Sequence, residues 1–424
     1  MKHIAVVGAG VIGVTTAWYL RQAGFDVTVY DRRSGVALGS SAANAGIIAP
    51  GYVTPWAAPG MPRKLASYLI KAESPIIFRP ALDVRQWRWI ARWLKECAAP
   101  RYRRNRERMQ RLARYSREEL HRLRQDTGID DLRSQGYLQL FRTPQDIELT
   151  ATARRMLDEQ GVAYRLLDAS QARLQEPSLE PDAPLAGALF LADDESADCQ
   201  LFTRRLAALA ESQGVSFVFD RTVAAIHHEH GRVRGLLLGR QRLAEPNTVA
   251  CDAVVVAAGV DSVPLLRALG IGAPIYPIKG FSATIDLLPD ATAPAQALMD
   301  EAYKTAITPL GRKLRIAGTA EIGGHALRLR KTALKTLRKV AADWFGASFD
   351  LTTARYWVGA RPMTPDGPPL LGRTLLEGLF VNIGHGSTGW AMSCGSACAT
   401  ADLVAGRTPA INLAGLTLAR LAEP

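Results

Sequence analysis

The chain has 424 residues, more than one domain usually holds, so at least two domains are expected. Its 48% hydrophobic and 22% charged residues exclude a disordered protein, and its 36 glycines follow no collagen-like period. Its 52 Lys and Arg outnumber its 40 Asp and Glu, and the resulting net charge of +12 is compatible with an anionic partner.

The first 31 residues have the pattern of a dinucleotide-binding unit. They contain a strand, a glycine turn, a helix, a second strand and an acidic residue, over Ile4–Val7, Gly8–Gly13, Val14–Gln22, Phe25–Tyr30 and Asp31. In such a unit Gly8 makes the tight turn, Gly10 lets the backbone approach a pyrophosphate, and Gly13 lets the helix pack on the strand. The helix start favours phosphate, and Asp31 is placed to bind a ribose diol. NAD and FAD both fit this arrangement.

The segment from Ser40 to Tyr52 is rich in small and hydroxyl-bearing residues. Such a loop can form hydrogen bonds to phosphate and ring atoms, and it lacks long side chains that would block a flat ring. This composition favours a flavin over a nicotinamide. A helix start capped by Ser40 is the alternative interpretation.

A strongly basic stretch follows. Between Arg85 and Arg124 fourteen basic residues face four acidic ones, an excess of ten that accounts for most of the net charge. Within it, residues 85–97 mix Trp with Arg on an expected helix, on which Trp89, Ile90, Trp93 and Leu94 share a face. Two interpretations remain open: peripheral contact with a membrane interface, or packing of the Trp residues onto the protein.

The rest of the chain alternates between two kinds of pattern. Strands that rejoin the first sheet are expected at Val215–Phe219 with Val223, at Ala253–Val256 before Gly259, and at Leu379–Ile383. The last leads through the glycine-rich loop Gly384–Trp390 into a helix from Ala391 to about Val404. Antiparallel strands are expected in between, at Gly136–Phe141, Tyr276–Asp286, Ala302–Thr308 and Lys313–Thr319.

These patterns predict an α/β fold with two discontinuous domains. A split Rossmann-like FAD-binding domain is expected over residues 1–55, 190–270 and 345–424. A substrate-binding α+β domain with an antiparallel sheet is expected over residues 56–189 and 271–344.

Targeting and redox features are few. The uncharged stretch Ile4–Leu20 is like a signal peptide in its apolar character, but its glycines and the strand that follows favour folded structure. No other stretch reaches the about 18 apolar residues of a membrane span. Five scattered cysteines predict neither a disulfide framework nor a metal site, although Cys394 and Cys398 lie one helical turn apart.

Six motifs together resemble the D-amino acid dehydrogenase family (small subunit type), within the amine-oxidising flavoproteins that include D-amino acid oxidase. They are Gly8–Gly13, Ser40–Gly51, Gln200–Thr203, Tyr276–Gly280, Gly359–Gly367 and Gly384–Trp390. The resemblance implies non-covalent FAD and oxidative deamination of D-amino acids to 2-oxo acids and ammonia. It also implies electron transfer to a quinone or another respiratory acceptor, with oxygen a poor acceptor.

The residues expected to bind FAD come from these motifs and from the strand ends. They are Gly8, Gly10, Val11, Ile12, Gly13, Asp31, Arg32, Ser40, Ser41, Asn44, Ala45, Gly46, Ile48, Val223, Ala258, Gly259, Gly359, Gly386, Ser387, Thr388, Gly389 and Trp390.

Arg361 is the expected substrate anchor. An amino acid brings a carboxylate that must be desolvated, and a guanidinium can hold it bidentately and so fix the direction of the Cα–H bond. The resemblance gives this role to the Arg of the motif. A structural pair of Arg361 with Asp366 is the alternative. Weaker candidates for the site wall are Tyr52, Tyr303 and Lys279.

No general base is required if hydride leaves Cα for flavin N5 from a neutral amine, so His385 is not given that role. Two other functions remain open. One is an oxidase or dehydrogenase of the same group acting on a secondary amine such as D-proline, hydroxy-D-proline, glycine or sarcosine. The other is a flavoprotein acting on RNA, although no nucleic-acid motif is present and no nucleic-acid partner is expected. We expect a cytoplasmic protein, at the periphery of the inner face of the cytoplasmic membrane if the basic helix binds lipid.

Overall fold

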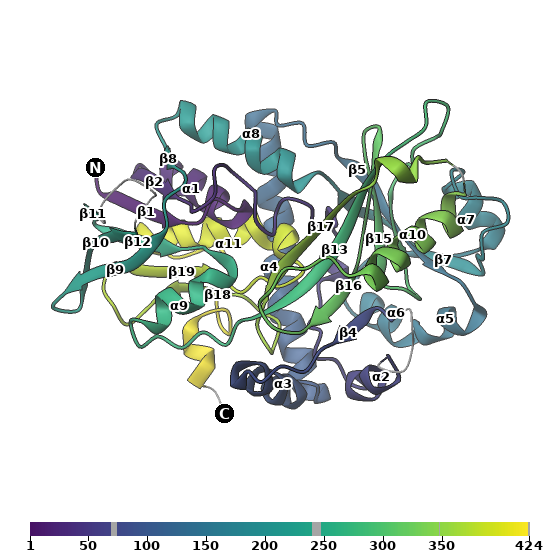
Figure 1. Cartoon of the computed structure of the whole chain (residues 1–424), viewed down its shortest axis with the longest axis horizontal. Coiled ribbons are helices and arrows are strands. Elements are labelled where there is room, and N and C mark those ends of the chain that lie inside the picture. The colour runs from purple at the N-terminus through teal and green to yellow at the C-terminus, as the bar shows by residue number, and fades with distance from the viewer. Residues whose placement is uncertain (69–73, 240–246, 347, 423–424) are drawn as a thin grey trace.

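The computed structural model describes residues 1–68, 74–239, 247–346 and 348–422, and its architecture is built on two large sheets (Figure 1). The first is a six-stranded sheet with the order β18-β19-β12-β1-β2-β8. Its strands are β1 (His3–Val7), β2 (Asp26–Tyr30), β8 (Ser216–Val218), β12 (Ala253–Val256), β18 (Leu370–Arg373) and β19 (Leu379–Ile383). All neighbours are parallel except β18 and β19, as expected of a doubly wound sheet.

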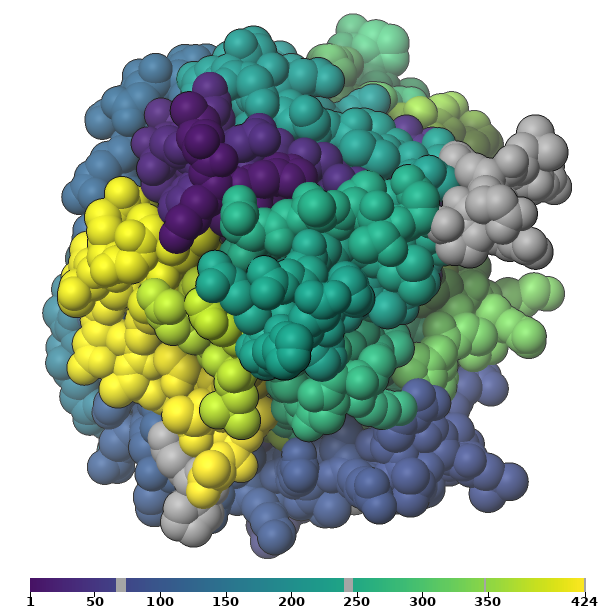
Figure 2. Space-filling model, turned by 90° about the vertical axis from the view of Figure 1, so that its left-hand side faces the viewer, coloured from purple at the N-terminus to yellow at the C-terminus, as the bar shows by residue number. Residues whose placement is uncertain are grey.

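Helices cover this sheet. Beside α1 (Val11–Gln22) lie α8 (Cys199–Ser212) and α11 (Gly389–Val404), and α11 also packs on the long α4 (Ala99–Thr127). The apolar strands β1 and β12 are buried because helices and a small third sheet shield them. Figure 2 shows the N-terminal, central and C-terminal segments side by side on this end of the molecule. The segments expected at Ile4–Val7, Ala253–Val256 and Leu379–Ile383 therefore do meet in one sheet.

The second sheet has ten strands. Its main order is β17-β13-β16-β15-β14-β5-β7-β3, and β4 and β6 pair with β16 and β7. The strands are β3 (Ile47–Ile48), β4 (Ile76–Phe78), β5 (Ser134–Phe141), β6 (Arg165–Asp168), β7 (Gly187–Ser196), β13 (Tyr276–Asp286), β14 (Ala297–Asp300), β15 (Thr305–Leu310), β16 (Lys313–Ile322) and β17 (Arg355–Met363).

The two faces of the ten-stranded sheet differ in what they contact. One face packs on α10 (Lys331–Phe345) through a cluster that includes Trp344 and Leu337. The other face turns toward Ala45, Ile47 and Tyr52, in the segment that follows the nucleotide-binding unit. This second face lies opposite the ends of the six-stranded sheet, so a site between the sheets draws residues from both.

The remaining described elements are peripheral. The third sheet has the order β11-β10-β9, from β9 (Val223–Glu229), β10 (Arg232–Leu238) and β11 (Asn247–Ala250). The other helices are α2 (Met61–Tyr68), α3 (Val84–Glu96), α5 (Pro144–Leu149), α6 (Ala151–Asp158), α7 (Ala169–Gln175) and α9 (Ser262–Arg267). Short 3-10 turns occur at Pro50–Tyr52, Gly259–Asp261, Leu351–Thr353 and Leu418–Ala422. Within the described ranges, no helix has both the length and the apolar character that crossing a bilayer demands.

Some strands pair in a different sheet from the one that the expected domain boundaries would place them in. The strands β3, β7 and β17 pair within the ten-stranded sheet, although Ile47–Ile48, most of β7 and all of β17 fall in segments predicted for the FAD domain. Residue Val223 begins β9 of the three-stranded sheet rather than continuing the strand at Ser216–Val218. Long-range pairing of this kind leaves no local sequence signal, because each strand is equally apolar in either sheet.

The Trp-rich helix α3 packs against the protein. Trp89 and Trp93 are buried and stacked, and the Trp89 indole N–H donates to the Met363 carbonyl at 2.9 Å. Leu94 is 47% exposed, so the expected common face of Trp89, Ile90, Trp93 and Leu94 is split between core and solvent. Their order in the helix therefore did not predict which of them would reach solvent.

Candidate active site

A cavity of about 960 Å³ lies between the two sheets. It borders Gly8 after β1, Ala257 after β12 and Gly384 after β19, which are carboxyl ends of parallel strands. Open α/β sheets bind ligands at this edge because loops and helix starts offer free backbone groups there. The opposite wall comes from β13, β15, β16 and β17 of the ten-stranded sheet.

The glycine turn is built for close backbone contact. Gly8 has a φ of +112°, which only glycine adopts readily, and a Cβ there would lie 2.6 Å from the Ala257 carbonyl oxygen. A Cβ on Gly13 would overlap the Gly8 carbonyl, so this glycine lets α1 pack on the turn, as predicted. The Asp31 carboxylate accepts from the Ala9 and Arg33 backbone N–H groups at 2.7 and 2.8 Å. Because a carboxylate has about four acceptor positions, Asp31 keeps capacity for a ribose diol.

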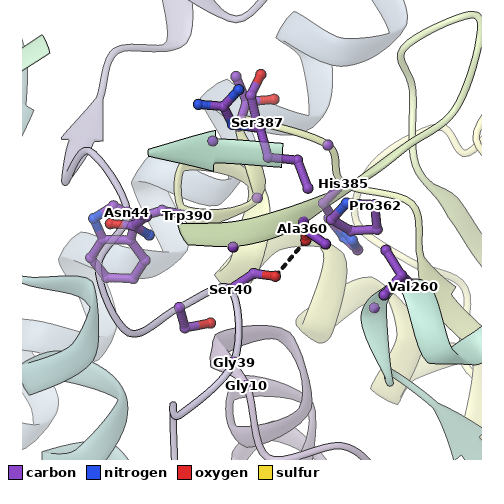
Figure 3. A pocket seen from close by; sticks show the side chains of 18 of the residues that line it. Gly10, Gly39, Ser40, Asn44, Val260, Ala360, Pro362, His385, Ser387 and Trp390 are labelled. Atoms are coloured by element: carbon purple, nitrogen blue, oxygen red, sulfur yellow. Dashed lines mark hydrogen bonds between the residues drawn. The ribbon is translucent and has the colours of Figure 1, made fainter. Parts of the chain in front are cut away.

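The loop from Ser40 to Gly46 is held between the sheets by hydrogen bonds. The Ser41 hydroxyl accepts from the Val11 N–H at 3.0 Å, and the Ser40 hydroxyl donates to the Ala360 carbonyl at 2.6 Å (Figure 3). The Asn44 side chain accepts from the Gly46 N–H at 3.0 Å. The alternative of a helix start at Ser40 is wrong, because no helix begins there.

Three residues on the ten-stranded sheet fix the same loop, and the sequence reasoning missed them. Ser282 donates to the Ala43 carbonyl at 2.9 Å, Arg315 to the Asn44 carbonyl at 3.1 Å, and Thr308 to the Ala45 carbonyl at 2.5 Å. These hydrogen bonds turn the carbonyls of three successive loop residues, Ala43, Asn44 and Ala45, toward the sheet. Their strands carry several buried polar residues, so nothing in the sequence singles out these three.

The second glycine loop closes the cavity next to α11. Gly384 and Gly386 have positive φ values of 80° and 59°. His385 Nε2 lies 3.0 Å from the Ser396 hydroxyl, and burial lowers the pKa of His385 to about 3, so its imidazole is neutral near pH 7. Asn382 Oδ1 and Trp390 Nε1 border the cavity and are buried without a partner among the described residues. Such atoms favour a polar ligand.

Arg361 presents a guanidinium to the cavity. It lies within β17, two residues before the end of the strand. Its guanidinium lies flat against Gly280, where a methyl group would overlap it, and 5.6 Å from the centre of the Trp56 ring. Burial lowers the pKa of Arg361 to about 10, which still leaves it charged at neutral pH.

No carboxylate of the described residues pairs with Arg361, and no hydrogen bond from its guanidinium to them is present. The alternative pairing with Asp366 is wrong, because Asp366 binds Arg420 at 2.7 Å instead. A desolvated cation without a protein anion is costly unless a ligand supplies the negative charge. The cavity next to Arg361 is therefore suited to a carboxylate.

Of the weaker candidates, only Tyr52 lines the cavity. Its hydroxyl donates to Glu301 at 3.4 Å, and burial raises its pKa to about 12. Tyr303 lies elsewhere, 4.7 Å from the guanidinium of Arg142. Lys279 is buried on an ion pair of 2.6 Å with Glu321. The expectation that Tyr303 and Lys279 line the site is wrong, because neither residue borders the cavity.

Most of the residues predicted for the cofactor lie on the cavity wall. They are Gly8, Gly10, Val11, Ile12, Asp31, Arg32, Ser40, Ser41, Asn44, Ala45, Gly46, Val223, Ala258, Gly259, Gly359, Gly386, Ser387, Thr388, Gly389 and Trp390. Gly13 and Ile48 lie behind it, the first under the turn and the second in the core. No cluster of metal-binding side chains occurs in the part of the chain that the structure describes.

Comparison with known proteins agrees with this geometry. The model of the family described as FAD dependent oxidoreductase matches residues 3–403. The chain belongs to that family. The D-amino acid dehydrogenase of Granulibacter bethesdensis is 44% identical over 99% of this chain and 100% of its own length. The D-amino acid dehydrogenase of Rhodopseudomonas palustris is 44% identical over 98% of this chain and 97% of its own length. This flavoprotein oxidoreductase thus falls among the D-amino acid dehydrogenases.

A solved structure extends the comparison at the level of the fold. Glycine oxidase from Geobacillus kaustophilus is 24% identical, covers 99% of both chains and has a TM-score of 0.73. That likeness concerns the fold alone. The cofactor is FAD, and the cavity fits it: the glycine turn, the Ser40–Gly46 loop and the unpartnered atoms of Asn382 and Trp390 would meet its phosphates and polar edges. When bound, FAD supplies the two-electron oxidation of the substrate.

Proposed function

We propose that this flavoprotein oxidises D-amino acids to 2-oxo acids and ammonia. The observation that carries the proposal is the guanidinium of Arg361, which is desolvated in the cavity wall without a protein carboxylate among the described residues. The D-amino acid dehydrogenases that share 44% of its sequence support the choice of substrate class.

The residues around the cavity would act by orientation rather than by proton abstraction. Arg361 would hold the substrate carboxylate by two parallel hydrogen bonds, which fixes the Cα–H bond relative to FAD. His385 is neutral, but its Nε2 faces Ser396 instead of acting as an exposed base. The substrate amine would therefore react in its neutral form, without a protein base to remove its proton.

An anaerobic spectral experiment tests this function. Holoenzyme is mixed with D- and L-isomers of alanine, methionine, phenylalanine and proline, and the flavin absorbance is followed. Bleaching by D-isomers and not by L-isomers is the expected result. Bleaching by L-isomers alone would show that the substrate class is wrong, and bleaching by D-proline alone would favour the secondary-amine function.

We further infer that a quinone or another respiratory acceptor reoxidises the enzyme. The dehydrogenase relatives support an acceptor other than oxygen. Dye reduction and peroxide yield during turnover with D-alanine measure the two routes separately. A dehydrogenase gives rapid dye reduction with little peroxide, whereas stoichiometric peroxide would contradict this part of the proposal.

We also propose a peripheral membrane contact through the region of α3. The side chains that could make it are not the expected Trp89 and Trp93. Trp89 and Trp93 are buried, whereas Leu82, Val84 and Trp87 are exposed by 111%, 61% and 47% at the start of the helix. Apolar tips flanked by arginines suit the interface of an anionic bilayer. The helix lies along the lower edge of the molecule beside α2 (Figure 1). We place the protein on the cytoplasmic side of such a membrane.

Flotation with vesicles of anionic and of neutral lipid tests this contact. The double variant Leu82→Ser with Trp87→Ser should lose binding, and Arg88→Glu with Arg92→Glu should lose only the preference for anionic lipid. The matched control is Leu375→Ser, a fully exposed leucine in the turn between β18 and β19. If both double variants bind vesicles as well as the Leu375→Ser control does, the proposed membrane contact is wrong.

A further inference from the structure

The Trp56 side chain lies over the substrate anchor. Its ring centre is 5.6 Å from the Arg361 guanidinium carbon, within the range of a cation–π contact. Gly280 also lies against the guanidinium and leaves no room for a methyl group. The planar cation is therefore in contact with both a glycine backbone and an indole ring.

Trp56 also contacts the second glycine loop. Its indole N–H donates to the Ser387 hydroxyl at 3.2 Å, and Ser387 lies in the loop that closes the cavity before α11. Trp56, Arg361 and Ser387 all line the cavity. The ring thus bridges the anchor on β17 and the loop expected to meet the cofactor, which are brought together from three distant parts of the chain.

The freedom of Arg361 makes this contact important. An arginine side chain has several rotatable bonds, and the buried Arg420 is fixed by the Asp366 carboxylate and the Pro369 carbonyl. Arg361 has no such partner among the described residues. Its contacts with Gly280 and Trp56 then orient its donors before substrate arrives.

We propose that Trp56 is a positioning residue that presents the edge of the Arg361 guanidinium to the substrate carboxylate and couples this anchor to the cofactor loop through Ser387. This rests on the proposed function in one respect, that the anchored group is a carboxylate. Loss of the ring leaves Arg361 charged but unoriented, so affinity for a carboxylate falls, while the oxidation of substrate that does bind changes less.

The test uses the FAD-loaded enzyme and propanoate, which is D-alanine without its amino group. Propanoate is titrated into wild type, Trp56→Leu, Trp56→Phe and Ser387→Ala, and the change in flavin absorbance gives Kd. Trp56→Leu should raise Kd by about tenfold, the loss expected for a desolvated cation–π contact. Trp56→Phe and Ser387→Ala should raise it by only about two- to threefold, since each keeps a ring over the cation.

Steady-state kinetics with D-alanine separate positioning from mere structure. In Trp56→Leu KM should rise with Kd while kcat stays within about threefold, and Trp56→Phe should restore most of the affinity. In an Arg361→Lys background the Trp56→Leu change should cost less than about twofold, because the two residues act as a unit. A full tenfold loss in that background would overturn the coupling.

The outcomes distinguish this inference from the proposed function. Equal propanoate affinity in wild type and Trp56→Leu, or no propanoate binding by wild type, overturns the role of Trp56. Propanoate binding that depends on Trp56, together with no oxidation of D-alanine, would overturn the proposed substrate and leave the positioning role intact. If Trp56→Leu loses FAD, the graded losses of Trp56→Phe and Ser387→Ala decide the matter.

Discussion

Two cations on neighbouring strands, one buried in the protein and one half-buried in the cavity wall, have opposite surroundings. On β13, Lys279 pairs in register with Ala360 of β17, and the next pair in the ladder joins Ile278 with Arg361. The Lys279 ammonium has the Glu321 carboxylate at 2.6 Å and also donates to the carbonyls of the 323–326 segment. The Arg361 guanidinium has a cavity and an aromatic ring, with no protein anion among the described residues.

This difference separates a structural charge from a binding charge. Glu321 also binds Arg330 at 2.8 Å, so its carboxylate is fixed by two cations and the Lys279 charge is paired within the protein. A balanced buried group stabilises one conformation and has nothing left to offer a ligand. An unbalanced group destabilises the empty protein, and binding of an anion relieves that penalty. The two cations should therefore respond to substitution in opposite ways.

The largest effect is expected for Arg361→Met. Two charge-assisted hydrogen bonds would be lost, each worth about 1.5–3 kcal/mol, so kcat/KM for a D-amino acid should fall by roughly 10²–10⁴-fold. Stability should stay the same or rise, because an unpaired buried charge is removed. Dye-linked kinetics and thermal unfolding of the FAD-loaded variant measure both. An active variant with lowered Tm would reverse the assignment.

Lys279→Met should have the opposite effect, lowering stability while leaving kcat/KM nearly unchanged. Removing one member of a buried pair leaves Glu321 with Arg330 alone, and breaking such pairs costs about 3–5 kcal/mol of unfolding free energy. The folded fraction should keep kcat/KM within about threefold of wild type, since Lys279 does not line the cavity. Denaturant unfolding and kinetics at a permissive temperature check this. A hundredfold loss of kcat/KM at unchanged stability would mean that Lys279 serves the site.

Asp194 sharpens the comparison, because it is buried with one oxygen unpartnered among the described residues yet lies away from the cavity. Burial raises its pKa from 3.8 to about 7. The folded state then holds a proton between about pH 4 and 7 that the unfolded state has released, so stability falls as pH rises through this window.

Asp194→Asn removes that penalty. Near pH 4 the variant and wild type should have similar stability, and above pH 7 the variant should be more stable by about 2–4 kcal/mol, the upper value following from the shift of pKa. Unfolding at pH 5 and pH 8 measures the difference. The charge of Arg117 lowers the pKa of Asp194 and partly offsets the effect of burial. A variant that gains equal stability at both pH values would indicate that Asp194 is ionised throughout.

The local elements of the fold could be predicted because their signals are local. The strands at Tyr276–Asp286 and Leu379–Ile383 have the predicted bounds, and the glycine turn at Gly8 and the loop before Trp390 lie where the sequence placed them. Glycine turns and apolar runs are set by neighbours within a few residues. The resemblance of six motifs then supplied the family.

Long-range partners could not be predicted. Whether Lys279 faces the cavity depends on Glu321, which joins it only through the pairing of β13 with β16. Ser282 and Thr308 hold the cofactor loop from strands more than 230 residues away in sequence. The contact of Trp56 with Arg361 likewise joins residues that are far apart in the sequence. A single sequence shows each of these residues but not the partner that gives it a role.

The most direct test of the central claim is a crystal structure of the FAD-loaded protein with propanoate. The account predicts the carboxylate in the cavity beside Trp56, with both oxygens about 2.7–2.9 Å from guanidinium nitrogens of Arg361. A carboxylate bound elsewhere in the cavity, with Arg361 turned to a protein anion, would contradict it.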